Sequence, residues 1–233
     1  MLLVMKKILI KLYSVAISFY NSLRFKSLHN SGSLIFLTKF KGIEFSEIAL
    51  DNAILKQSCI HIDGKGNELI LRQSYLWKVK IQIFGKNNLI EIEADAKLNL
   101  TTIVLRGNNC HIRIGKRTTF GSSYMVCMGE GNSITIGDEC MFAENIEIWN
   151  TDSHPIFNLE GKIVNPSKPV CIGNHVWCGK GCKILKGVTI GDNAIVGMQS
   201  LVTKDIPAGT LNVGIPAKSI RENIIWNRHF ITI

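Results

Sequence analysis

A single histidine in the sequence has the surroundings expected of a general base. His154 follows Thr151-Asp152-Ser153 and opens residues 155–169, a stretch with three of the five prolines and no repeat pattern. An imidazole gains and loses a proton near neutral pH, so a histidine at the root of a loop suits proton removal from an acceptor hydroxyl. Asp152 either orients the imidazole ring or is a solvated turn acid.

The remaining histidines and the cysteines do not form a recognisable metal site. The seven cysteines include no C-x-x-C pair and no flanking histidine at zinc spacing. His61 and His111 alternate with isoleucines that would point inward, so we expect both rings to face solvent, as we do for His175 at a repeat corner. The cysteines are therefore predicted to be small core residues of a reduced protein, and no metal is required.

The positive charge is concentrated at the N-terminus. The chain has a net charge of +9, and residues 1–41 hold seven basic residues and no acidic one. The other 192 residues hold 27 − 7 = 20 basic against 18 acidic residues, a balance of +2. A nucleic-acid-binding protein usually spreads basic residues over its binding surface, so nucleic acid is not predicted as a partner.

Residues 3–25 have the periodicity of an amphipathic helix with a basic and polar stripe. Such a helix either packs on its own protein or lies on an anionic membrane surface. No small-residue cleavage site follows it, and no apolar run is long enough to span a bilayer. We therefore expect a cytoplasmic protein that has possible peripheral contact with the inner face of the membrane.

The elements that must position His154 are visible as repeats. Between residues 66 and 136, an Asn turn followed by an I-x-I strand recurs, and Asn67, Asn88, Asn109 and Asn132 are spaced by 21, 21 and 23 residues. One turn and one strand per unit of this size indicate a solenoid.

After residue 170 the period shortens to six. The apolar residues at this spacing are Ile172, Cys178, Ile184, Ile190, Val196 and Val202, and small or aliphatic residues follow each of them four positions later. The pattern fits a triangular prism in which each hexad forms one flat face and three hexads make one turn. Ile172 and Ile190 are therefore predicted to stack, and the predicted fold class is an all-β solenoid.

The ordered motifs between Ile112 and Arg221 resemble those of the hexapeptide-repeat acyltransferases, and most closely those of sugar and capsular-polysaccharide O-acetyltransferases. The motifs are Ile136-Gly137-Asp138, Thr151-Asp152-Ser153-His154-Pro155-Ile156, Ile172-Gly173-Asn174-His175-Val176-Trp177-Cys178-Gly179, Ile184-Leu185-Lys186-Gly187-Val188-Thr189-Ile190-Gly191, Val202-Thr203-Lys204-Asp205-Ile206-Pro207 and Gly214-Ile215-Pro216-Ala217-Lys218. The resemblance implies a left-handed parallel β-helix, acetyl-CoA as acetyl donor, His154 as catalytic base and a homotrimer with sites between subunits.

The resemblance also implies a cofactor site near the C-terminus. The matching positions are Gly179, Lys180, Met198, Thr203, Lys218 and Arg221, to which Lys204 adds a cation suited to a phosphate. Lys218 and Arg221 would share one face of a short C-terminal helix and clamp the 3′-phosphate. The alternative is a solvated basic end. Two residues depart from the family pattern: Met198 is larger than usual, and Ile215 replaces a commoner Asn.

Two residues are candidates for the acceptor side. Trp177 matches the family's V-W-I-G signature, and an outward Trp requires a cover, which could be pantetheine, the acceptor or a neighbouring subunit. Relatives carry an Asn one coil upstream of the catalytic His, where this chain has Ser123. A serine hydroxyl or a backbone N–H would then have to stabilise the oxyanion.

The sequence thus predicts an acetyl-CoA-dependent O-acetyltransferase that acts on a sugar hydroxyl of a cell-surface polysaccharide of capsule or O-antigen type, or of its precursor. The alternatives are an N-acetyltransferase of a nucleotide-linked amino sugar and a non-catalytic β-helix scaffold. A zinc carbonic anhydrase on the same fold is disfavoured, because a close histidine pair is missing. The predicted organisation is a basic helical arm over residues 1–40, a β-helix domain over 41–207 with a protruding loop at 155–169, and a C-terminal extension over 208–233.

Overall fold

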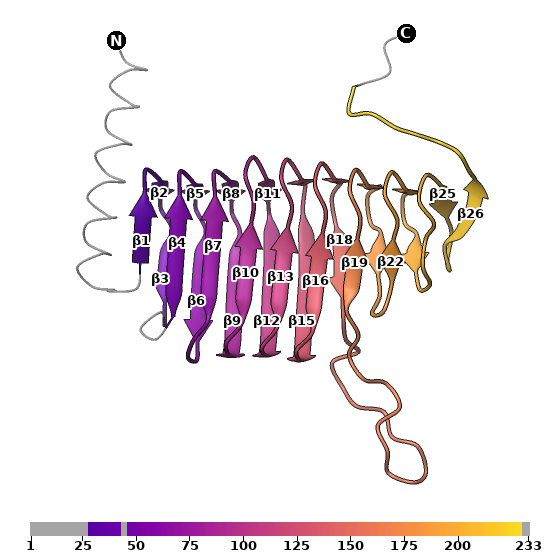
Figure 1. Ribbon diagram of the computed structural model, residues 1–233, viewed down its shortest axis with the longest axis horizontal. Coiled ribbons are helices and arrows are strands. Elements are labelled where there is room, and N and C mark those ends of the chain that lie inside the picture. The colour runs from indigo at the N-terminus through magenta and orange to yellow at the C-terminus, as the bar shows by residue number, and fades with distance from the viewer. Residues whose placement is uncertain (1–27, 43–45, 230–233) are drawn as a thin grey trace.

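The computed structural model describes residues 28–42 and 46–229, and these form an elongated parallel β-solenoid (Figure 1). Successive strands visit three sheets in turn, so each coil of the chain contributes one strand to each side of a three-sided prism. The predicted all-β solenoid is confirmed.

The three sides are called sheets A, B and C. Sheet A contains β1 (Leu28–Ser31), β4 (Glu47–Asp51), β7 (Glu68–Arg72), β10 (Leu89–Ile92), β13 (His111–Ile114), β16 (Ser133–Ile136), β19 (Val170–Ile172) and β22 (Thr189–Ile190). Sheet B contains β2 (Leu34–Phe36), β5 (Ile54–Lys56), β8 (Tyr75–Trp77), β11 (Lys97–Asn99), β14 (Thr119–Phe120), β17 (Met141–Phe142), β20 (Trp177–Cys178), β23 (Ile195–Val196), β25 (Leu211–Val213) and β26 (Lys218–Arg221). Sheet C contains β3 (Lys39–Lys41), β6 (Cys59–Asp63), β9 (Lys80–Lys86), β12 (Thr101–Asn108), β15 (Ser123–Glu130), β18 (Ile146–Trp149), β21 (Lys183–Ile184) and β24 (Leu201–Val202).

The coils stack in register, and alternate side chains point into the prism. Ile172 pairs with Ile190, as the hexad spacing predicts. The inward side chains form one continuous column of Ile, Leu and Val with small residues near the corners, and most of them are completely buried. Five of the seven cysteines are buried in this column, whereas Cys59 is half-buried and Cys171 is exposed on sheet A.

The corner between sheets A and B, called the A–B corner, depends on a backbone conformation that side chains usually avoid. In seven coils one residue at this corner has a positive φ between 40° and 60°: Asn52, Gln73, Asp95, Arg117, Glu139, His175 and Asn193. The left-handed conformation turns the chain sharply between two flat strands, and it costs the least for short polar residues. The remaining edges are called the B–C and C–A corners.

An asparagine ladder stabilises the C–A corner of the longer coils. The Asn88 side chain donates to Gly107 O (2.8 Å), and Asn88 Oδ1 accepts from Cys110 N (3.0 Å). Asn67 lies directly before it in the stack and donates to Gly85 O (2.9 Å). Both side chains are buried. Asn109 does not continue the ladder, because the pairing of β10 with β13 places Cys110 after Asn88 in the stack.

Two predicted boundaries are wrong. The solenoid begins at β1, so the first coil occupies residues 28–41, most of which we assign from the sequence to the helical arm. The predicted short C-terminal helix is absent, because residues 218–221 form β26, which pairs antiparallel with β25. Residues 222–229 then run back over the coils (Figure 1). The predicted helix over residues 3–25 lies outside the described residues.

Within the described part of the chain, no helix is long and apolar enough to cross a membrane. The same residues contain no cluster of three or more His, Cys, Asp or Glu side chains with the arrangement of a metal site.

The ladder leads to a stability prediction. Asn88→Ala should destabilise the fold by about 2–4 kcal/mol, because it leaves Cys110 N–H and Gly107 C=O buried without their partners. Chemical denaturation measures the change, and Lys86→Ala, an exposed substitution in the same coil, is the matched control with an expected effect within about 0.5 kcal/mol. Equal midpoints for the two variants would contradict the structural role of the ladder.

Candidate functional site

His154 lies at the root of a long loop, as predicted. β18 ends at Trp149 and β19 begins at Val170, and the chain between them projects away from the prism (Figure 1). An isolated antiparallel bridge between Phe157 and Ile163 makes the projection a narrow hairpin. Its side chains are strongly exposed, and Leu159 is fully exposed. An apolar surface of this kind, held out from the body of the protein, needs a partner surface to cover it.

The backbone around His154 is held by a hydrogen-bond network. The Asn165 side chain donates to His154 O (2.9 Å) and to Asp152 Oδ2 (2.8 Å), and its Oδ1 accepts from Ile156 N (2.6 Å). Lys186 reaches across from the next coil and donates to Asp152 Oδ2 and to Asn165 O (3.0 Å). These interactions clamp both ends of the loop together.

Asp152 is exposed, as the solvated-acid reading expects, and it is also an anchor of the loop root. Its carboxylate accepts from Lys186 and Asn165, and these hydrogen bonds hold the pKa of Asp152 below its usual value. Among the described residues, no hydrogen bond from the His154 ring to the Asp152 carboxylate is present, and His154 is exposed. Lys186, which sequence reasoning missed as a site residue, is part of Ile184-Leu185-Lys186-Gly187, and only its stacking position revealed its role.

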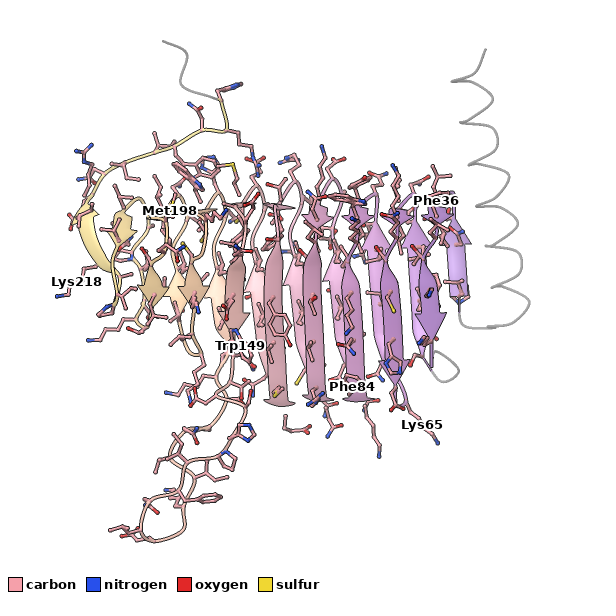
Figure 2. All side chains as sticks on the ribbon, turned by 180° about the vertical axis from the view of Figure 1, so that it is seen from behind. Phe36, Lys65, Phe84, Trp149, Met198 and Lys218 are labelled. Atoms are coloured by element: carbon pink, nitrogen blue, oxygen red, sulfur yellow. The ribbon has the colours of Figure 1, made fainter. Side chains whose placement is uncertain are left out.

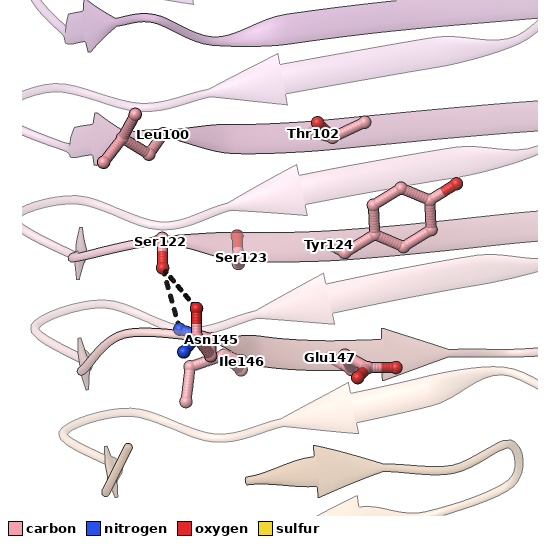
Figure 3. A pocket seen from close by; sticks show the side chains of 8 residues that line it. All are labelled: Leu100, Thr102, Ser122, Ser123, Tyr124, Asn145, Ile146 and Glu147. Atoms are coloured by element: carbon pink, nitrogen blue, oxygen red, sulfur yellow. Dashed lines mark hydrogen bonds between the residues drawn. The ribbon is translucent and has the colours of Figure 1, made fainter. Parts of the chain in front are cut away.

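Ser123 lines a shallow pocket of about 560 Å³ at the other end of sheet C (Figure 3). The other lining residues are Leu100, Thr102, Ser122, Tyr124, Asn145, Ile146 and Glu147. Ser123 is nearly buried, and its hydroxyl lies 3.1 Å from Thr101 Oγ1. β18 pairs with β15 from Ile146, opposite Ser123, to Trp149, opposite Val126, and the loop that carries His154 begins beyond Trp149. Within one chain Ser123 and His154 therefore lie toward opposite ends of these two neighbouring strands.

Trp177 faces outward from sheet B with 37% of its surface exposed, as predicted. Part of its cover comes from an element that sequence reasoning missed, the C-terminal segment over residues 222–229. The Trp226 ring lies 5.8 Å from the Trp177 ring and stacks on His175 at 4.2 Å. His175 is consequently half-buried rather than solvent-facing.

Arg228 anchors the end of this C-terminal segment. Its guanidinium donates to the carbonyl oxygens of Arg117, Glu139 and Cys140 at the A–B corner. The segment thus returns across several coils and supports the outward Trp177 from one side. No short-range pattern in residues 222–229 could have indicated this contact.

The predicted cofactor residues gather toward the C-terminal end of the solenoid. Lys180, Met198, Thr203, Lys204, Lys218 and Arg221 are all exposed, and Figure 2 places Met198 and Lys218 at that end. Lys180 is paired with Glu144 at 2.8 Å. A side chain at Gly179 would place its Cβ 2.7 Å from Met198 N, so close stacking of the coils already requires this glycine.

Lys218 and Arg221 do share one face, although for a different reason from the one predicted. Arg221 pairs with Leu211 and Lys218 pairs with Val213, and the register shifts between them. Residues directly opposite in an antiparallel pair point to the same side of the sheet, so this β-bulge brings both cations onto the outer face of sheet B. The shared face is a product of the bulge rather than of a helix.

The predicted site residues therefore form two groups on different edges of the prism. His154, Asp152, Thr203 and Lys204 lie at the C–A corner, whereas Ser123, Gly179, Lys180 and Met198 lie at or beside the B–C corner. Trp177, Lys218 and Arg221 lie on sheet B. Sheet C separates the two edges, so within one chain His154 shares a corner with Thr203 and Lys204 but not with Gly179, Lys180 and Met198.

Comparisons with known proteins agree with this architecture. The family model for the bacterial transferase hexapeptide (six repeats) matches residues 172–204. A polysialic acid O-acetyltransferase of Neisseria meningitidis is 36% identical over 172 residues, which are 64% of this chain and 80% of that protein. A polysialic acid O-acetyltransferase of Escherichia coli O1:K1 is 34% identical over 140 residues, which are 60% of this chain but only 45% of that protein.

Two solved structures share the fold over most of the chain. The polySia-specific acetyltransferase NeuO superposes with a TM-score of 0.71 at 30% identity, covering 88% of this chain and 90% of that one. The polysialic acid O-acetyltransferase OatWY superposes with a TM-score of 0.60 at 29% identity, covering 89% and 92%. The solenoid is thus a left-handed parallel β-helix, as the sequence resemblance implies.

The clamp around the loop root leads to a prediction. Lys186→Met should loosen the loop, because both of its hydrogen bonds to the loop are lost while the aliphatic stem remains. Amide hydrogen exchange at His154 and Ile156 should become faster by tenfold or more, about 1.4 kcal/mol of lost protection. Lys183→Met is the matched control, since Lys183 forms only an exposed pair with Glu147 at 3.2 Å. Unchanged exchange in Lys186→Met would show that Lys186 does not hold the loop.

Proposed function

The chain belongs to the hexapeptide-repeat O-acetyltransferases, and we propose that it transfers an acetyl group from acetyl-CoA to a hydroxyl of an anionic cell-surface polysaccharide. The observation that carries the proposal is the match to the Neisseria meningitidis polysialic acid O-acetyltransferase over 80% of that protein's length. The exposed His154 on a clamped loop root supports it. The names of these relatives favour O-acetylation over the alternative N-acetylation of an amino sugar.

In the proposed mechanism His154 acts as general base. Its ring nitrogen accepts the proton of the sugar hydroxyl as the oxygen attacks the thioester carbonyl carbon. Backbone N–H groups would stabilise the oxyanion of the tetrahedral intermediate. The C–S bond then breaks, the CoA thiolate takes the proton from the imidazolium, and the acetyl ester remains on the sugar.

We further propose that the site is completed by a second copy of the chain in a trimer. The separation of His154 from Trp177 and the B–C corner supports this arrangement, because a head-to-tail contact can bring different surfaces of two copies together. The exposed apolar hairpin at 155–169 offers the covering contact that such an interface needs. Contact of residues 3–25 with a membrane, and the location inside the cell, stay predictions from the sequence.

His154→Ala should lower turnover by about 10²–10⁴-fold while the fold and the oligomeric state stay intact, since general-base catalysis is usually worth that much. Release of CoA thiol in the presence of glycan acceptors measures turnover. Turnover within tenfold of the parent protein would refute the role of His154.

Mixing variants tests the shared site. His154→Ala and Trp177→Ala, each inactive alone, should recover about one quarter of the parent activity when coexpressed at equal levels, because random trimers pair an intact His154 with an intact Trp177 at that frequency. No recovery from mixed oligomers would place both residues in a site within one chain.

Lys218→Ala with Arg221→Ala should raise the KM for acetyl-CoA, because the shared outer face of these cations suits the 3′-phosphate. The same double variant should have little effect on the KM for acetyl-dephospho-CoA, which lacks that phosphate. Lys97→Ala with Lys116→Ala, two exposed cations elsewhere on the prism, is the matched control. An equal rise with both thioesters would show that Lys218 and Arg221 do not bind the 3′-phosphate.

A further inference from the structure

The charged side chains of the first four coils are sorted between the faces of the prism. The sheet A strands of these coils carry the acids Glu47, Asp51, Glu68 and Glu91, with Arg72 as their only Lys or Arg. The strands of sheets B and C carry Lys39, Lys41, Lys56, Lys80, Lys86, Lys97 and Arg106, with Asp63 as their only acid. In these four coils the strands of sheet A are therefore mainly acidic, and those of sheets B and C are mainly basic.

Among the described residues, the sheet A strand acid Glu91 has a cationic partner, whereas none of the ion pairs includes a cation of the sheet C strands of these four coils. Arg72 pairs with Glu91 at 3.4 Å and with Glu93 at 3.1 Å. Among the described residues, none of the ion pairs includes Lys39, Lys41, Lys78 or Lys80, and all four are exposed. These four residues are called the basic strip. A row of exposed like charges creates a positive potential that attracts an approaching anion.

The basic strip is continuous with the pocket beside Ser123. The strand register places Lys39, Cys59, Lys80 and then the pocket residues Thr102 and Tyr124 in one outward row along sheet C. Lys80 thus lies one coil, about 4.8 Å, from Thr102, and Lys39 lies about 14 Å from it. Lys78 stands one coil before the pocket residue Leu100 at the B–C corner.

Aromatic rings border the strip and are held by cations. Lys78 Nζ lies 4.9 Å from the centre of the Trp77 ring, and Arg106 lies 5.2 Å from that of Phe84. A cation over an aromatic face restrains both groups, and the pair presents an apolar surface beside a positive charge. A sugar that carries a carboxylate offers both complementary features, namely apolar C–H groups and a negative charge.

We propose that the basic strip binds acidic sugar residues of the acceptor chain, beyond the residue that receives the acetyl group. The inference rests on the proposed function and adds to it the course of the acceptor, which would run along sheet C toward the N-terminal coils. Its length suits an oligosaccharide rather than a single sugar.

The test compares long and short acceptors on the full chain. Lys78→Glu with Lys80→Glu should raise the KM for a sialic acid polymer about tenfold or more and leave the KM for a sialic acid trisaccharide within about twofold. The polymer KM of the parent protein should rise steeply with salt, and that of the variant should not. The matched control is Lys97→Glu with Lys116→Glu, which makes the same charge change near the A–B corner. Binding of a fluorescent polymer, measured without acetyl-CoA, provides a readout that does not need turnover.

The outcomes separate the two proposals. Transfer by the parent protein to neither acceptor, with polymer binding that the strip variant loses, would overturn the proposed acceptor chemistry and keep the strip as a polyanion site. Transfer to both with equal losses in the strip variant and the control would overturn the strip. A change in the sedimentation of the strip variant would show that this face joins copies of the chain. If the strip variant lost binding to anionic vesicles but bound the polymer as the parent protein does, the strip would be a membrane-binding surface. Either result would also overturn the inference.

Discussion

Every coil of this protein must hydrogen-bond to the coil before it and the coil after it, with the inward side chains in register. A shift by one residue would turn a whole row of isoleucines outward, so the stacking register controls all other features. The chain can nevertheless insert the long loop after Trp149, because Val170 resumes sheet A directly beside Ile134. The insertion leaves the stack intact and places His154 on its edge. The position of the site is therefore set by a loop inserted at a corner of the solenoid, and the site has no separate fold of its own.

The sequence was a good guide wherever the chemistry is local. Inward and outward alternation is a property of neighbouring residues, so the hexads after residue 170, the outward Trp177 and the loop that begins at His154 could all be predicted. The first coil was missed because the stretch between Lys41 and Glu47 lacks the Asn turn of the later coils. The antiparallel β26 was mistaken for a helix, since a spacing of three residues suits a helical face and a bulged strand equally.

The contacts that the sequence did not reveal join residues far apart in the chain. Lys186 reaches Asp152 across 34 residues, and Trp226 stacks on His175 across 51. Both contacts depend on how many residues each corner contains, and a single extra residue would move them to another face. The same dependence explains why Ser123 and His154 could be matched to a family pattern and still lie toward opposite ends of the neighbouring strands β15 and β18. A sequence motif shows which residues are present, whereas the register of the coils determines which of those residues are in contact.

Charge follows the same logic. The net charge of the residues after the N-terminal arm is close to zero. This sum does not show that acidic and basic side chains lie on different faces of the prism. Residues on sheets A and C alternate in blocks of a few residues, so acids such as Glu68 and cations such as Lys80 are close in sequence but face opposite directions. Coulomb attraction between them is weak across the prism, whereas each acid on sheet A lies near Arg72 or faces water. The cations of sheet C consequently contribute a positive potential beside the pocket, where an anionic acceptor would approach. A solenoid can therefore carry a row of charged side chains without disturbing its core. The residues that point outward from each coil can differ in type, whereas those that point inward must be apolar.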